Sequence, residues 1–360
     1  MKDMDKKFND QKETIEINTK ENKMQNVIQI KAVTMTPLTQ IDSNGKQRSR
    51  YIYEDGHTGR IPFFSANGFR GGLRRMATRK QIEEAKRQDP DITITPDAFY
   101  LYSSGAALDK KALLPENLEY EEEVKIRKNT PILSLFGAGL SQIEGKLAVT
   151  DLVPSPDTER LIISEKKDGT VFAFSPLMGE DTFFRSDSID AASLWSKVLG
   201  KDLASIRNWR DEYMSVVAES KKEKEKANKK AKKEEKKEEA KEAFSHIKQP
   251  IDLKFMMPGV TLTSSIGSKF GFELNDIEIG CILNALLDLS MSQIGSHKRL
   301  GFGVLSWEVK LNGELMFETK SDKEYVLFKE VSLTDMGKSK IEKWEEYLSE
   351  HAKDIKEPLV

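Results

Sequence analysis

The sequence has 360 residues, a length that fits one large domain or two of ordinary size. Charged residues make up 32% and the formal net charge is -2, so the whole chain is not a basic nucleic-acid binder and any cationic surface must come from local clusters. One cysteine and four histidines argue against a disulfide framework or a zinc site. No apolar run is long enough to span a membrane and the charged N-terminus lacks the apolar core of a signal peptide, so we expect a cytoplasmic protein without cofactor or metal.

The first part of the chain predicts strands that lead into one long helix. Residues 1–25 are polar and are expected to form a disordered tail. Residues 26–35 (NVIQIKAVTM) partly alternate apolar with polar side chains, which predicts a strand, and residues 50–53 predict a second, short one. Ser65 or Asn67 can cap a helix that begins there and continues through the 80s.

The first turns of this helix carry three arginines, Arg70, Arg74 and Arg75. Positions 70 and 74 share a face because they are four residues apart. Cations near a helix N-terminus oppose the helix dipole, which favours negative charge there. We therefore expect these arginines to face the negative charge of a ligand, with a solvated basic helix as the alternative.

The remaining elements fall on either side of a highly charged segment. Residues 219–243 are almost entirely Lys, Glu and Ala without an apolar stripe, which predicts a solvated helix or a flexible insertion. Residues 274–294 show an amphipathic pattern that predicts a helix with Cys281 buried, ending directly at Gly295. Further predictions are a helix near 115–125, strands at 144–152 and 302–311, ordered structure from 251 to 262, a strand pair or edge at 316–327, and a C-terminal helix at 332–352.

The glycine-rich loop at residues 295–303 (GSHKRLGFG) is the most informative motif. Its three glycines permit positive φ and close approach of another chain, and Lys298 and Arg299 place charge where the backbone is barest. Such a loop suits a phosphate backbone, because amide N–H groups and cations converge on it. It follows a helix and precedes a strand, whereas a nucleotide-binding P-loop joins a strand to a helix. A turn with two solvated cations is the alternative.

Four motifs occur in an order that is typical of one protein family. They are IPFFSANGFRGGLR at 61–74, Leu-Phe-Gly at 135–137 followed by a strand and Asp151, Pro-Gly-Val-Thr-Leu at 258–262, and the loop at 295–303. Together they resemble the signatures of the RAMP superfamily of CRISPR-associated proteins. Within that superfamily the chain is most similar to the Cas seven-type backbone subunits, which polymerise along a CRISPR RNA.

The resemblance implies an α+β fold with a ferredoxin-like, RNA-recognition-motif-type palm at 26–330, fingers at about 76–130, a thumb at about 176–250 and a C-terminal helix and tail at 331–360. It implies an oligomeric protein that binds CRISPR guide RNA with copies of itself and other effector subunits. The guide is then presented to target nucleic acid, which we expect to be DNA, in defence against or competition with mobile elements. The residues implied to contact RNA are Arg48, Arg50, Ser65, Asn67, Arg70, Arg74, Arg75, Gly295, His297, Lys298, Arg299 and Gly301.

The sequence also departs from the family pattern. Type III backbone subunits carry a catalytic aspartate in an Ile-Asp-Ser segment shortly before the Ile-Pro strand, but the stretch at 47–51 is cationic here. We therefore expect a type IV-like subunit that is not an enzyme. One alternative is cleavage of target RNA through Asp42, which lies further upstream in Ile-Asp-Ser. Others are guide-RNA processing with His297 or His57 as general acid/base, and a structural protein without nucleic acid.

Overall fold

The chain divides into two compact units, and most of the described residues belong to the first. The computed structural model describes residues 26–42, 46–105, 119–138, 143–185, 249–321 and 329–356. The first unit comprises Met1–Glu180 with Lys254–Val360, and the second is Asp181–Leu253. The predicted tail at 1–25 and the Lys/Glu segment at 219–243 lie outside the described residues. Of the second unit, only parts of two paired strands are described, which are β8 (Met178–Arg185) and β9 (Gln249–Met256).

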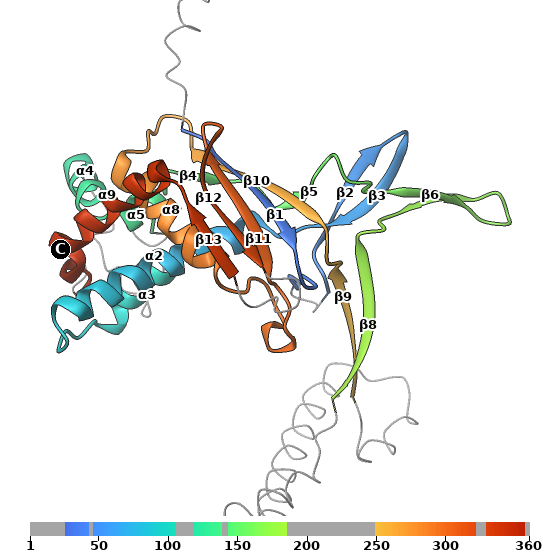
Figure 1. The fold of residues 1–360 in the computed structure, drawn as a ribbon, viewed down its shortest axis with the longest axis horizontal. Coiled ribbons are helices and arrows are strands. Elements are labelled where there is room, and N and C mark those ends of the chain that lie inside the picture. The colour runs from blue at the N-terminus through green and yellow to red at the C-terminus, as the bar shows by residue number, and fades with distance from the viewer. Residues whose placement is uncertain are drawn as a thin grey trace, which may run out of the picture. The chain divides into compact units, whose positions relative to one another are not determined.

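An antiparallel seven-stranded sheet organises the first unit, so the expected α+β class is confirmed (Figure 1). Its strands are β1 (Ile28–Thr34), β4 (Leu147–Val149), β5 (Val153–Pro154), β10 (Thr261–Ser268), β11 (Leu305–Leu311), β12 (Glu314–Ser321) and β13 (Lys329–Leu333). The order is β13-β12-β11-β1-β10-β4, and β5 also pairs with β10. The strand nearest the N-terminus therefore lies in the interior of the sheet, between two strands from the last third of the chain.

The helices and short turns of the first unit are α2 (Ala66–Gln88), α3 (Pro96–Ser104), α4 (Tyr120–Asn129), α5 (Pro131–Phe136), α8 (Asp276–Ser290), η1 (Lys298–Leu300), α9 (Asp335–His351) and η2 (Ala352–Lys356). The helices α2 and α8 lie against one face of the sheet (Figure 1). None of the helices in the described part of the chain is both long enough and apolar enough to cross a membrane.

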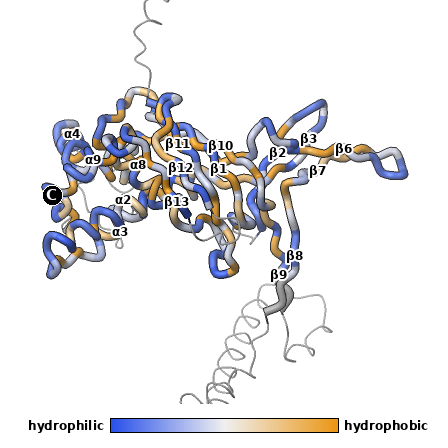
Figure 2. Tube along the Cα trace, in the orientation of Figure 1, coloured by the Kyte–Doolittle hydropathy of each residue, from blue (hydrophilic) through white to orange (hydrophobic). Residues whose placement is uncertain are grey.

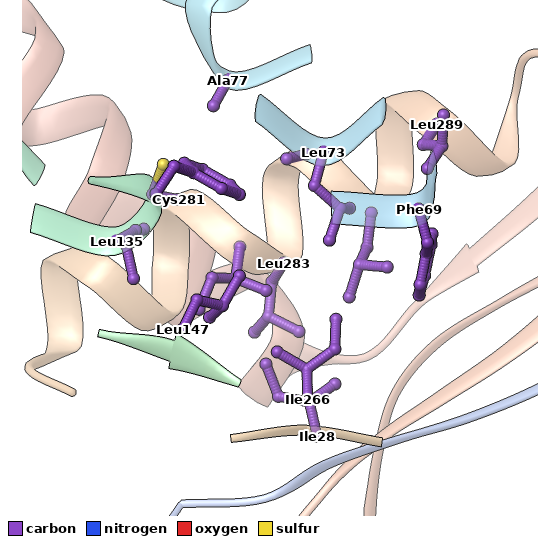
Figure 3. Close-up of a cluster of buried hydrophobic side chains, with 14 of the residues drawn as sticks. Ile28, Phe69, Leu73, Ala77, Leu135, Leu147, Ile266, Cys281, Leu283 and Leu289 are labelled. Carbon is purple, nitrogen blue, oxygen red and sulfur yellow. The ribbon is translucent and has the colours of Figure 1, made fainter. Parts of the chain in front are cut away.

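The core forms between this helical layer and the sheet. On α2, Phe69, Leu73 and Ala77 recur every four residues, so one stripe of the helix is apolar and buried (Figure 3). The strands β1, β10 and β11 alternate buried with more exposed side chains, as expected for a sheet covered on one face. Cys281 of α8 is fully buried in the same cluster, which confirms the prediction that it acts as a small apolar residue.

Two hairpins add to this framework. They are formed by β2 (Ser49–Glu54) with β3 (His57–Pro62), and by β6 (Ile162–Glu165) with β7 (Val171–Phe174). The β2–β3 turn is Asp55-Gly56, and both residues have positive φ, at 50° and 80°. That backbone matches the two-residue turn that the right-handed twist of a hairpin favours.

Most predicted elements are present, but some differ in their bounds. The strand predicted at 144–152 is limited to β4, which spans Leu147–Val149. The predicted helix 274–294 ends at Ser290, because the hydroxyls of Ser290 and Ser292 donate to carbonyls of its last turn. The helix expected near 115–125 begins at Tyr120, and residues 106–118 lie outside the described residues. The helix α3 was not predicted, although Thr95 caps it and Gly105 ends it in a left-handed conformation.

A buried ion pair connects α8 to the start of β4. Glu278 is 1% exposed, and its Oε1 accepts from Lys146 Nζ at 2.8 Å and from Ser134 Oγ at 2.6 Å. Its Oε2 accepts from the backbone N–H of Asn275, which completes a capping box at the helix N-terminus. One carboxylate thus fixes where α8 begins relative to α5 and β4.

The substitution Lys146→Met should destabilise the protein by about 3 kcal/mol, because it leaves the buried Glu278 carboxylate without its cation. The matched control is Lys343→Met, since Lys343 pairs with Glu346 at the surface, and its cost should stay below about 0.5 kcal/mol. Urea unfolding followed by circular dichroism measures both. Equal shifts for the two variants would contradict the structural role given to Glu278.

Candidate nucleic-acid interface

Backbone hydrogen bonds hold the glycine-rich loop at residues 295–303 in place. The N–H of Gly303 donates to the carbonyl of Pro37 at 2.9 Å, and the N–H of Ser296 donates to that of Thr39 at 2.8 Å. Thr39 Oγ1 in turn donates to the carbonyl of Ser296 at 3.2 Å. The loop is therefore fastened to the segment that follows β1, from Pro37 to Gln40, which we call the 37–40 segment.

Two of the loop glycines are required because other backbone atoms occupy the space of a side chain. A Cβ at Gly303 would collide with the carbonyl of Ile294, and one at Gly295 would collide with the carbonyl of Thr39. Both glycines have φ of +85°. Gly301 also has positive φ, at +82°, but a Cβ there would meet open space. Gly301 ends the short turn η1, so glycine is favoured there only by the left-handed backbone conformation.

The loop brings its cations close to those of α2. Lys298 and Arg299 lie in η1 and are exposed, and Arg75 is exposed on α2. Although the residue as a whole is exposed, partial desolvation, and then the positive charge of Arg75, lower the pKa of Lys298 below its ordinary value. Among the described residues, no ion pair involves any of these three cations. One cation of α2 and one cation of the loop therefore act on each other, although they are far apart in the sequence.

Arg70 and Arg74 share the other face of α2, as their spacing predicts, but they contact carbonyl groups. Arg74 is 6% exposed, and its Nε and Nη2 donate to the carbonyls of Tyr102 and Leu101, each at 2.6 Å. Arg70 Nη2 donates to the carbonyl of Phe136 at 2.6 Å. Burial, followed by the charge of Arg70, lowers the pKa of Arg74 to about 10. Arg74 thus caps the C-terminal end of α3, a structural role that the sequence did not indicate, and its contact with RNA stays a prediction.

A cavity of about 420 Å³ opens on this second face of α2. Its lining includes Asn67, Arg70 and Lys269. Arg70 Nε is buried without a hydrogen-bond partner within the described residues. Lys269 pairs with Glu144 at 2.7 Å, which partly neutralises the cavity. Asn67 and Arg70, both predicted RNA contacts, therefore line a cavity whose lining does not include Arg75.

The start of α2 is fixed by side chains from three parts of the chain. Ser65 caps the helix, as expected, and its Oγ also accepts from Gln40 Nε2 at 2.9 Å. The N–H of Ala66 donates to Asp151 Oδ1 at 2.6 Å, and Arg50 Nη1 lies 3.4 Å from Asp151 Oδ2. The carboxylate of Asp151 supplies the negative charge that the first turn of the helix lacks. The unfavourable interaction between the arginines and the helix dipole, which the sequence indicated, is therefore offset by a carboxylate of the protein itself.

Three residues left open by the sequence have defined environments. Asp42 Oδ1 accepts from the N–H of Lys46 at 3.0 Å, so its carboxylate has a backbone partner. His297 has φ of 57°, and its ring lies edge-on to Phe302 with centroids 6.3 Å apart. Arg48 is exposed at the base of the β2–β3 hairpin. No group of three or more His, Cys, Asp or Glu side chains is placed to hold a metal ion within the described ranges.

Sequence reasoning missed the 37–40 segment. Thr39 contacts the glycine-rich loop and Gln40 contacts the helix cap, so this segment joins the two predicted motifs. Its contacts are to residues far away in the sequence, and no local pattern indicates them.

Comparison with known proteins finds distant structural similarity. No family model matches the chain, and no curated protein matches its sequence. A chain of a solved "Type IV-B CRISPR Complex" is similar with a TM-score of 0.44 and 15% identity, covering 79% of this chain and 90% of that one. A chain of the "Type III-B Cmr-beta bound to cognate target RNA" has a TM-score of 0.35 and 12% identity, covering 86% of this chain and 66% of that one.

The two glycines Gly301 and Gly303 should respond differently to alanine. Gly301→Ala should cost about 1 kcal/mol, the strain of a left-handed residue with a Cβ. Gly303→Ala should cost roughly 3 kcal/mol or more, because the loop must also move away from the Ile294 carbonyl. Thermal unfolding of both variants tests this, and a Gly303→Ala protein as stable as Gly301→Ala would show that the loop is not fastened as described.

Proposed function

We propose that this chain is a non-enzymatic subunit of a CRISPR effector complex that binds guide RNA through its phosphate backbone. The observation that carries the proposal is a glycine-rich loop that backbone hydrogen bonds hold in place with Lys298 and Arg299 exposed in its turn. The positive charge of Arg75 on α2 also acts on Lys298. The type IV-like backbone role is inferred from the four sequence motifs; Lys298 lies in the last of them, and Arg75 directly follows the first. Its partners would be guide RNA, further copies of this chain and other effector subunits.

We infer that part of the sheet is the ferredoxin-like palm that the motifs imply. Apart from the elements inserted between them, six elements follow one another in βαββαβ order, which are β1, α2, β4, β10, α8 and β11. Their spatial order is β11-β1-β10-β4, with every neighbouring pair antiparallel. This combination supports a ferredoxin-like arrangement. This arrangement accounts for the position of both basic motifs. The arginines lie on α2, its first helix, and the glycine-rich loop follows α8, its second helix.

Electrostatics favours a polyanion at this surface. Cations that repel each other and lack carboxylate partners among the described residues are stabilised when a phosphate lies between them. The backbone of the loop is fixed before the ligand arrives, so little order has to be created on binding. Contacts with phosphates do not distinguish one base sequence from another. In the proposed assembly, base pairing between guide and target, which we expect to be DNA, would supply the specificity.

Each of Arg75→Gln and Lys298→Gln should weaken binding of single-stranded RNA and reduce the salt dependence of its affinity. The slope of log K against log salt should fall in magnitude by about 0.7 for each phosphate that the variant no longer neutralises. Arg79→Gln is the matched control on the same helix, because Arg79 is exposed and already paired with Glu83 at 2.6 Å. Fluorescence anisotropy over a salt series measures the slopes. Weaker binding with an unchanged slope would contradict phosphate contact.

We also propose that the chain does not cleave RNA through Asp42. The carboxylate of Asp42 accepts a hydrogen bond from the backbone N–H of Lys46, which supports a structural role. The assembled complex should therefore leave complementary target RNA intact in the presence of Mg²⁺, both with Asp42 and with Asp42→Asn. Denaturing gel electrophoresis of end-labelled RNA gives the answer, and cleavage that disappears in Asp42→Asn would restore the enzyme alternative.

A further inference from the structure

We propose that a cavity beside the β2–β3 hairpin binds one unstacked RNA base between aromatic side chains. This inference rests on the proposed RNA-binding function and adds a subsite to it. The cavity has a volume of about 400 Å³ and is lined by residues that include Tyr51, Arg60, Phe174 and Lys254. Its size is within the range of small-molecule sites, about 300–1,000 Å³.

One wall is the outer face of the β2–β3 hairpin. Tyr51 and Tyr53 share this face because side chains alternate along a strand, and they are 68% and 73% exposed. Arg60 is the cross-strand partner of Tyr51, and its guanidinium carbon lies 4.9 Å from the centre of that ring. Aromatic rings of this size are usually covered in a folded protein, so this hairpin face has the composition of a binding surface.

The facing wall comes from the second hairpin. Phe172 and Phe174 of β7 stack with centroids 6.0 Å apart, and they are 38% and 44% exposed. Lys166 Nζ lies 5.7 Å from the centre of the Phe172 ring. The strands of this hairpin are hydrophobic and its tip is hydrophilic (Figure 2). Of these residues Phe174 lines the cavity, and the pair of Phe172 with Lys166 lies beside it on the same hairpin.

Packed side chains connect the cavity to the glycine-rich loop. Gly179 lines it and lies so close to Phe255 and Met257 that a Cβ there would collide with both side chains. Phe255 in turn contacts Phe302 of the loop, with centroids 5.6 Å apart in an edge-on arrangement. Lys298 and the aromatic cavity thus belong to the same unit and are connected through Phe302 and Phe255.

The side chains of the cavity fit an RNA base better than a purely apolar protein partner. Bases stack on tyrosine and phenylalanine, and nearby cations attract the phosphates that accompany them. The polar edge of a base finds donors and acceptors in Lys254 and Glu180, whose side chains pair at 3.3 Å at the cavity. A purely apolar protein partner would leave these groups and Arg60 without matching polar atoms.

The test compares RNA with an abasic oligonucleotide of the same length, which keeps the phosphates and lacks the bases. Tyr51→Leu should lower the affinity for RNA roughly 5- to 100-fold, the range for removing the stacking of one base, and leave the affinity for the abasic strand unchanged. Tyr51→Phe should retain the wild-type affinity for RNA. Tyr120→Leu is the matched control, because Tyr120 is 80% exposed on α4 and outside the cavity. Quenching of 2-aminopurine in RNA bound to the wild-type protein should show stacking directly.

Several results would overturn the proposal. Equal decreases in affinity for RNA and the abasic strand would mean that Tyr51 acts through the fold or through phosphates. Unchanged RNA affinity together with altered self-association would assign the surface to a second copy of the chain. In either case wild-type binding to RNA would persist, so the proposed function would stand. If wild-type protein bound neither strand, the proposed function itself would fail.

Discussion

The hydrogen bonds of the 37–40 segment are the constraint on which the candidate interface depends. This segment leaves the interior strand β1 and bonds to the glycine-rich loop through Pro37 and Thr39, then to the cap of α2 through Gln40. Most of these bonds use backbone atoms, so they fix the loop and the helix end in position whatever the exposed side chains are. The proximity of Arg75 to Lys298 follows from this arrangement. A nucleic acid would meet cations that are already placed.

The arginines of α2 lie in two different environments. Arg74 is buried and satisfies carbonyls at the end of α3, while Arg75, one residue later, is exposed next to the loop. A step of one residue turns a helix by about 100°, which separates a structural cation from a candidate binding cation. Asp151 removes the conflict with the helix dipole by receiving the N–H of Ala66. Positive charge near this helix start is therefore tolerated without a ligand, and the case for RNA rests on Arg75 and Lys298.

Local patterns predicted local structure well. The alternation in β1, the cap at Ser65 and the burial of Cys281 all follow from a few neighbouring residues, and all are confirmed. The helix α3 was not predicted, although its sequence carries local signals, the cap at Thr95 and the glycine at 105. It was therefore predictable from neighbouring residues. The end of α8 was misplaced because serine hydroxyls compete for its last carbonyls.

The candidate site was less accessible from sequence, because its environment comes from distant segments. The spacing of Arg70 and Arg74 correctly predicted a shared face, but it could not show that the carbonyls of Leu101 and Phe136 cover that face. Likewise, alternation predicted a strand at Tyr51 without showing that Phe174 from another hairpin lines the same cavity.

The central claim is that this chain assembles on guide RNA, and one purification tests it most directly. The protein is isolated from cells that carry a CRISPR array, its mass is measured by light scattering, and its bound nucleic acid is sequenced. The account predicts a high-mass assembly that holds RNA of uniform guide length. A monomer that carries no nucleic acid and binds no RNA, even with its neighbouring effector subunits present, would contradict it.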